Sequence, residues 1–212
     1  MSNPDSFIDE VTEELRRDRL SMLLRRWGWV AALAVLVLVG GAAFNEWRKA
    51  QDAARAEAFG DALLDALEGE GGAEAVAAVP AASPEQEILR ALAAAGVTAE
   101  TDRPAAAAAL VALGEGTADP VYRDLALTKA MLLGGTGDAA RDGAILADLA
   151  RAGRPFRTLA VEQQAIRAAR AGDVATAASL LRLLTEDAEA TDALRRRAEQ
   201  TIVALGLEVE PT

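Results

Sequence analysis

An apolar run near the N-terminus constrains the fold of this chain more than any other feature. From Trp27 to Phe44, 18 consecutive residues carry no charge. As a helix, the segment ending at Trp47 would be about 30 Å long, which matches the hydrocarbon core of a membrane. All three Trp of the chain flank this run, and indole rings favour the headgroup level. We therefore predict a transmembrane helix over residues 27–45. Its expected interface anchors are Trp27, Trp29, Phe44 and Trp47.

Two other interpretations of this run are less consistent with its length and flanks. A signal peptide usually has an apolar core of about 7 to 15 residues after a short basic segment. Here 26 residues precede the run, although Gly41, Ala42 and Ala43 offer small residues at which a peptidase could cut. A helix buried in a globular core gives no reason for Trp at both ends. A retained anchor explains both the length and the Trp positions.

The basic residues on either side of the run predict its orientation. Lys and Arg concentrate on the cytoplasmic side, counted within about 15 residues of each end. Three basic residues follow the run: Arg48, Lys49 and Arg55. Five precede it: Arg16, Arg17, Arg19, Arg25 and Arg26. We expect a cytoplasmic N-terminus and a C-terminal part outside the cytoplasm.

Residues 1–26 and the start of the anchor each carry a weaker signal. The first 26 residues predict an amphipathic helix with Phe7, Val11 and Leu15 on one face. This helix is either a solvated lead-in or a docking element for a cytoplasmic or membrane partner. Gly28 and Ala32 are four residues apart, a spacing that allows another membrane helix to pack closely, although Gly is common in such helices in any case.

The part of the chain beyond residue 26 is acidic and its pattern is helical. It holds 27 acidic and 17 basic residues, because the first 26 residues take six and five of the totals of 33 and 22, so its net charge is −10. Such a surface repels nucleic acid and anionic lipid, and neither is expected as a partner. Ala and Leu dominate, and no alternating run of Val, Ile, Thr or Tyr suggests a strand. We predict an all-α fold.

A repeat of 35 to 36 residues organises this part of the chain. The recurring positions are Pro84, Pro120 and Pro155; Asp102, Asp138 and Asp173; Leu110, Leu146 and Leu181; and Leu113, Leu149 and Leu184. The pattern fits a pair of helices, with Pro in the first turn, Asp capping the second helix and the leucines facing the core. A small residue at Ala107, Gly143 and Ala178 would let the two helices approach closely.

These signals divide the chain into five parts. A cytoplasmic amphipathic helix over 1–26 precedes the transmembrane helix over 27–45. A connecting helix and linker over 46–83 follow, with a break at Gly69 to Gly72. Residues 84–206 hold three repeats, 84–119, 120–154 and 155–189, and a terminal helix that Asp192 can cap. Residues 207–212 form a tail.

The period and the Ala-Gly-Asp-x-x-x-Ala pattern resemble tetratricopeptide repeats, most clearly in RAARAGDVATAASLLRLL over residues 167–184. The whole layout is similar to the YfgM-like family of bacterial inner-membrane proteins. The shared marks are SNPDSFIDEVTEELRRDRL at the start, NEWRKA at the end of the anchor, and PFRTLAVEQQAIRAARAGD late in the chain. The resemblance implies a helical-hairpin solenoid in the periplasm, anchored in the inner membrane. It also implies an ancillary role at the Sec translocon, near a membrane-anchored folding factor.

The residue types argue against catalysis. The chain has no His and no Cys, which removes the usual catalytic triads and nearly all zinc sites. Asp61, Asp65 and Glu68 form a row on one helix face, which is typical of a solvated surface. Residues 135–140 match a dinucleotide-binding pattern, but a helical segment precedes them where that fold needs a strand. We expect no enzyme activity, no cofactor, no metal and no small-molecule substrate.

These features distinguish three classes of function. A tethered interaction scaffold needs only an anchor and a repeat surface, and the resemblance makes the Sec channel its expected partner. A scaffold for division or wall-building proteins of the cell envelope has the same requirements and is the alternative. A membrane-bound enzyme would need a pocket of convergent polar groups, which the sequence does not offer.

Overall fold

The chain is helical over all the residues that the structure describes. This computed structural model describes residues 4–208, with side chains described for 25–30 and 32–208, and no strand occurs in that range. The chain divides into two compact units. The first ends at Ala58 and the second begins at Phe59. The predicted all-α class is confirmed.

Helix α1 (Pro4–Glu68) holds the apolar run. From Arg25 onward it is long and apolar enough to cross a membrane, and the apolar window is not buried within the protein. The segment before the anchor is not a separate helix, because α1 runs without a break from Pro4 to Glu68. The structure describes no side chains for residues 1–24. The amphipathic face predicted there and the side chains of Arg16, Arg17 and Arg19 therefore lie outside the described residues.

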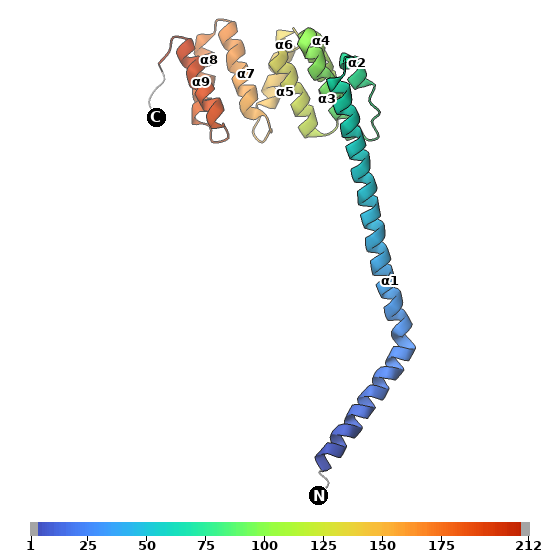
Figure 1. Ribbon diagram of the computed structural model, residues 1–212. Coiled ribbons are helices and arrows are strands. Elements are labelled where there is room, and N and C mark those ends of the chain that lie inside the picture. The colour runs from blue at the N-terminus through green and yellow to red at the C-terminus, as the bar shows by residue number, and fades with distance from the viewer. Residues whose placement is uncertain (1–3, 209–212) are drawn as a thin grey trace. The chain divides into compact units, whose positions relative to one another are not determined.

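The second unit contains the remaining helices of the described range. They are α2 (Gly72–Ala77), α3 (Pro84–Thr101), α4 (Arg103–Gly116), α5 (Pro120–Leu133), α6 (Ala139–Leu149), α7 (Arg157–Arg170), α8 (Val174–Glu186) and α9 (Asp192–Ala204). Each helix packs against the next from α2 to α9, and α5 also contacts α3 and α7 (Figure 1). Each range of the predicted repeats contains two of these helices.

Side chains at the helix starts define most of these boundaries. Asp102, Asp138 and Asp173 accept backbone N–H groups of α4, α6 and α8 at 2.8 to 3.1 Å, as predicted. Two predictions were wrong. Pro155 does not lie in a first helical turn, because α7 begins at Arg157. Thr191 rather than Asp192 caps α9, through a bond to the Leu194 N–H.

Two apolar clusters form the core of this unit. The first cluster contains residues of α3, α4, α5, α6 and α7. The second contains residues of α7, α8 and α9 and of the loop before α9. Five repeat leucines are at most 1% exposed: Leu110, Leu146, Leu149, Leu181 and Leu184. Leu113 is half-buried against the first cluster. The repeat positions with the recurring Leu therefore supply much of the core.

The expected close approach at the small repeat position differs between the repeats. Ala107 and Ala178 are buried, but Gly143 is exposed and has nothing within 4 Å of where a Cβ would be. The tight contact lies at Gly114 instead, where a Cβ would come within 2.8 Å of the Leu127 side chain. Helices α4 and α5 therefore approach closely across the boundary between two repeats.

The linker before the repeats contains a helix that the sequence did not predict. Helix α2 begins at Gly72, after the break that ends α1. Val76 in α2 is fully buried and Val79 nearly so. The Arg90 side chain of α3 donates to the Val79 carbonyl at 2.7 Å, which ties this segment to the first repeat range.

Candidate interaction surface

A shallow groove of about 560 Å³ crosses α5, α7 and α9. Its apolar lining consists of Leu132, Ile166 and Ala204, and Leu132 is 46% exposed. Its polar lining consists of Glu162, Gln163, Arg197, Gln200 and Thr201. A surface of this mixed kind can contact the side chains and the backbone of another protein.

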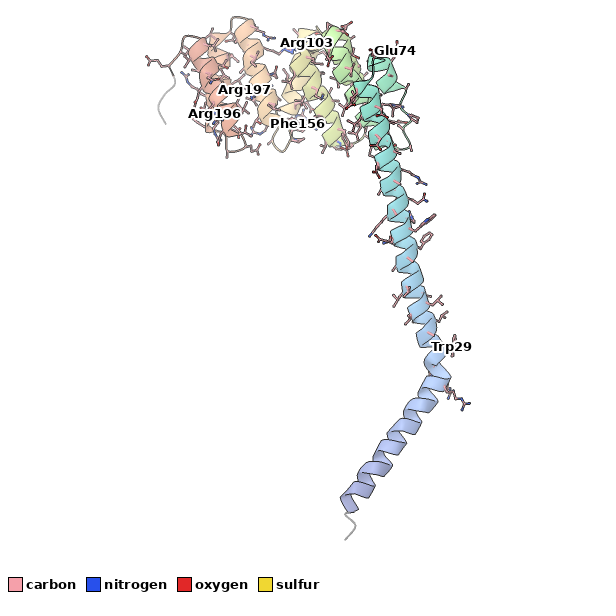
Figure 2. The ribbon with its side chains drawn as sticks, viewed as in Figure 1. Trp29, Glu74, Arg103, Phe156, Arg196 and Arg197 are labelled. Atoms are coloured by element: carbon pink, nitrogen blue, oxygen red, sulfur yellow. The ribbon has the colours of Figure 1, made fainter. Side chains whose placement is uncertain are left out.

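An ion pair fixes the polar side of this groove. Glu162 of α7 is only 6% exposed and accepts two hydrogen bonds from Arg197 of α9, at 2.8 and 2.7 Å. The hydrogen bonds that Arg197 donates to Glu162 raise the pKa of the Arg197 guanidinium further above its ordinary value. Arg197 thus neutralises a buried carboxylate and still reaches the surface, where Figure 2 shows it beside Arg196.

A second buried carboxylate orders the turn between α5 and α6. Asp142 is fully buried and accepts bonds from the Thr136 N–H at 2.8 Å and the Thr136 hydroxyl at 2.7 Å. The Arg167 guanidinium of α7 pairs with the same carboxylate. Gly135 lies against it with φ of +83°, and a Cβ there would collide with the carboxylate. The glycine motif over residues 135–140 is thus a structural turn.

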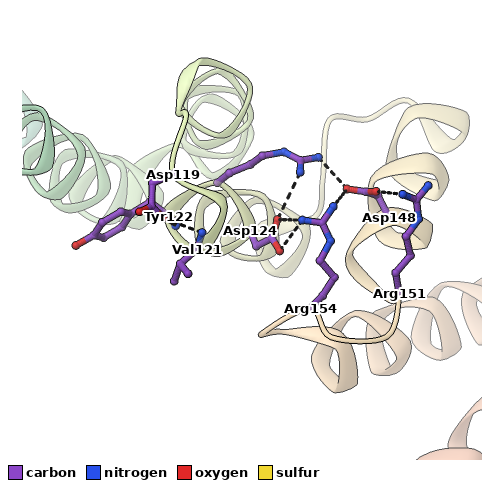
Figure 3. Close-up of polar contacts among 8 residues, drawn as sticks. Asp119, Val121, Tyr122, Asp124, Asp148, Arg151 and Arg154 are labelled. Carbon is purple, nitrogen blue, oxygen red and sulfur yellow. Dashed lines mark hydrogen bonds and ion pairs between the residues drawn. The ribbon is translucent and has the colours of Figure 1, made fainter.

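A third charge network joins α5, α6 and the loop before α7 (Figure 3). Arg154 donates to both oxygens of the fully buried Asp124 at 3.1 Å and to Asp148 at 2.7 Å. Arg123 and Arg151 complete the network through contacts with Asp148 at 2.8 and 3.0 Å. Burial raises the pKa of Asp148, but the bond from Arg123 and the charges of Arg154 and Arg151 outweigh this and lower it.

A fourth network holds α7 to the loop after α8. Arg157 donates to both Asp187 oxygens at 2.7 and 2.6 Å and to Glu189 at 2.8 Å. These bonds raise the pKa of Arg157, and the bond from Arg157 is the main cause that lowers the pKa of Asp187. Arg195 of α9 also donates to the Asp187 carbonyl at 3.0 Å. The ion pairs therefore stabilise the packing of consecutive helices.

These ion pairs were not among the predictions from the sequence, although the spacing of one pair matches the repeat. The partners Arg123 and Asp148 are 25 residues apart, as are Asp142 and Arg167. Glu162 and Arg197 are 35 residues apart, which is one repeat. The separation of Glu162 and Arg197 follows from the repeat period, whereas the pairs at 25 and 30 residues depend on how the helices pack.

The predicted membrane anchors are all exposed in the first unit. Trp27, Trp29, Phe44 and Trp47 are between 58 and 66% exposed, and Trp29 projects from α1 in Figure 2. The Phe44 and Trp47 rings lie with their centroids 6.0 Å apart. The site proposed for another membrane helix is also open, since Ala32 is exposed and no atom lies within 4 Å of a Cβ built on Gly28. Arg25 and Arg26 are exposed at the start of the anchor.

The acidic residues provide no metal site among the residues described. No group of three or more His, Cys, Asp or Glu there could hold a metal ion. Asp61, Asp65 and Glu68 are all exposed along α1. The four buried or half-buried networks consist of Arg and carboxylates that satisfy one another, an arrangement that serves packing.

Comparison with known proteins gives no match: no protein family, curated protein or solved structure is significantly similar to this chain. An exposed apolar helix lies in the same chain as a stack of helices with shallow, mixed grooves. This combination can hold a binding surface at a membrane.

Proposed function

We propose that this chain is a single-pass membrane protein whose helical unit binds other proteins. The observation that carries the proposal is the apolar segment of α1, which is unburied and long enough to cross a membrane. Its exposed Trp side chains suit the two headgroup regions. The second unit has its own core of two apolar clusters, and this supports a folded domain attached to the anchor.

The helical unit is proposed to be a tetratricopeptide-like solenoid. Three helix pairs of similar length repeat with a period of about 35 residues, and each pair packs against the next. Arrays of this kind act by presenting an extended surface to partners. The shallow groove over α5, α7 and α9 is the surface proposed here, and binding rather than catalysis is its proposed role.

The location proposed is the bacterial inner membrane, with the N-terminus in the cytoplasm and the helical unit in the periplasm. The five basic residues before the anchor and three after it support this orientation. The partner proposed is the Sec translocon, with a neighbouring folding factor that receives exported proteins. The resemblance to YfgM-like proteins supports this partner, and a tether would raise the local concentration of the helical unit there.

Affinity capture from mildly solubilised membranes tests this proposal. The full chain should recover the Sec channel, while the piece from residue 46 onward should recover much less. The acidic unit has few aromatic residues to anchor an interface, so tethering should supply a large part of the capture. A chimera with an unrelated anchor is the control, because it keeps proximity but removes Gly28 and Ala32. Recovery of division or wall-building proteins without the channel would instead favour an envelope scaffold.

A further inference from the structure

A second groove lies between the first half of α3 and the corner that joins α4 to α5. It encloses about 660 Å³. Ile88, Leu113 and Tyr122 form its apolar wall, and all three pack against the first core cluster from outside. Tyr122 is the only Tyr of the chain. The groove therefore offers an aliphatic and aromatic surface that is already held in place by the core.

Three exposed carboxylates lie around this wall: Glu85, Glu87 and Asp119. The hydrogen bond with Ser83 lowers the pKa of Glu85 from its ordinary value. Asp119 accepts the backbone N–H groups of Val121 and Tyr122 at 2.8 and 3.2 Å, as Figure 3 shows. These bonds hold the Asp119 carboxylate at the start of α5, beside the Tyr122 backbone.

These carboxylates differ from the acids that stabilise the fold. Within the range of described side chains, no ion pair involves Glu85, Glu87 or Asp119, whereas the buried acids of the unit each have an Arg partner. The groove has one basic lining residue, Arg90, and its guanidinium donates to the Val79 carbonyl. The groove therefore combines an apolar wall with three carboxylates and one guanidinium, which leaves a net negative charge.

We propose that this groove binds a cationic, leucine-containing segment of a partner protein. The stem of a Lys or Arg can lie along Ile88 and Leu113 while its charged end approaches the carboxylates. The face of Tyr122 adds a favourable site for a cation. Nucleic acid and anionic lipid would be repelled by the same carboxylates. This inference rests on the proposal that the helical unit binds proteins, but not on the Sec channel as the partner.

The test uses the full chain in nanodiscs of zwitterionic lipid and a short fluorescent peptide in which lysine and leucine alternate. Fluorescence anisotropy should show saturable binding above the signal from empty nanodiscs, and added salt should weaken it. Replacing the lysines by glutamate should abolish binding. Replacing the leucines by serine should weaken it strongly. Equal binding of either replacement peptide would overturn the proposal.

A matched pair of triple variants tests the location. Glu85→Gln with Glu87→Gln and Asp119→Asn should lower the affinity by about tenfold, and Asn preserves the helix cap. The control, Asp61→Asn with Asp65→Asn and Glu68→Gln, removes the same charge from exposed positions of α1. It should change the affinity by less than about twofold. Equal losses of affinity in the two variants would show that the overall negative charge attracts the peptide, and would contradict binding in this groove.

A single variant tests the apolar wall. Tyr122→Leu keeps an apolar side chain but removes the ring, and should weaken binding by about threefold. Circular dichroism should show that every variant keeps its helical content. Should the groove variant unfold, the peptide series and the salt dependence of the unchanged chain still decide the outcome. If the peptide binds but the Sec channel is not captured, the proposal for this groove stands and only the proposed partner is wrong.

Discussion

Glu162 and Arg197 lie 35 residues apart, on α7 and α9, and are joined by two hydrogen bonds of 2.8 and 2.7 Å. The carboxylate is almost fully buried, while the guanidinium is half exposed. The pair therefore contributes to the packing of α9 and also lines the groove over α5, α7 and α9. Removing Arg197 alone leaves the buried Glu162 carboxylate without its counterion.

We expect Arg197→Met to lower the free energy of unfolding by about 1.5–3 kcal/mol, because Glu162 loses two charged hydrogen bonds. The double variant with Glu162→Met should recover most of this loss, since no buried charge is then left. Arg196→Met is the control at an exposed neighbour and should cost less than about 0.5 kcal/mol. Urea unfolding of the helical unit measures all three. Equal effects at residues 196 and 197 would contradict the role given to the pair.

The repeat leucines give a second prediction on stability. Leu149→Ala and Leu184→Ala should each cost about 2–5 kcal/mol, because both side chains are fully buried and the change leaves a cavity. Arg151→Ala and Arg182→Ala alter exposed side chains nearby and should cost less than about 0.5 kcal/mol, because the Arg151 side chain is 72% exposed where it pairs with Asp148. Urea titration distinguishes the two classes. Small, similar losses at all four positions would mean that these leucines do not carry the core.

Alanine substitutions at three glycines distinguish the cost of backbone strain from the cost of a side-chain collision. Gly143→Ala should stabilise the protein by about 0.5–1 kcal/mol, because the residue is helical and has open space around it. Gly137→Ala should destabilise it by about 1–2 kcal/mol through its φ of +82° alone. Gly135→Ala should cost more than Gly137→Ala, because its Cβ would also meet the Asp142 carboxylate. Thermal unfolding of the three variants gives the order, and a milder effect at Gly135 than at Gly137 would contradict it.

The difference between Gly143 and Gly114 illustrates what the sequence could predict. Helix starts at Asp102, Asp138 and Asp173 follow from local capping, so the sequence located them. The close contact at Gly114 depends on how α4 meets α5, and no local pattern specifies that. The small residue at Gly143 recurs with the repeat, yet it faces solvent.

The candidate surfaces depend even more on tertiary structure. Glu85 lies in α3 and Asp119 caps the start of α5, and they share a groove only because α3 packs beside the α4–α5 corner. Helix α2 was missed because its Ala-rich sequence has weak periodicity, and burial of Val76 stabilises it. The membrane segment is the opposite case, since length and composition alone define it.

Acid should destabilise the helical unit below about pH 4. The folded state lowers the pKa of Asp187 from its ordinary value of 3.8, mainly through the bond from Arg157. A lowered pKa means that this stabilisation is complete above pH 3.8 and is lost as the pH falls through the folded-state value. Urea midpoints measured from neutral pH down to about pH 3 should show this decline.

The Asp187 contribution is isolated by removing its partner. Arg157→Met should lower stability at neutral pH and reduce the decline in acid, because Asp187 then keeps a pKa closer to its ordinary value. Arg182→Met removes the same charge from an exposed position of α8 and should leave the pH dependence unchanged. An acid decline of the same size in all three proteins would assign it to other carboxyl groups.

The last prediction concerns orientation in the membrane. The chain has no Cys, so single cysteines report their location without background. A membrane-impermeant maleimide added to intact spheroplasts should label Ala188→Cys, which lies at an exposed position after α8. It should label Ser6→Cys only after lysis. The reason is the excess of basic residues before the anchor, five against three.

Changing this balance tests the cause as well as the orientation. Arg25→Gln with Arg26→Gln leaves three basic residues on each side of the anchor, so both cysteines should become partly labelled in intact spheroplasts. Arg170→Gln with Arg182→Gln removes the same charge far from the anchor and should leave the labelling unchanged. If Ser6→Cys is labelled in intact spheroplasts while Ala188→Cys is protected, the helical unit is cytoplasmic and the periplasmic role is excluded. If this anchor variant keeps the original labelling, Arg25 and Arg26 do not set the orientation. The remaining N-terminal basic residues or the folding of the helical unit must then set it.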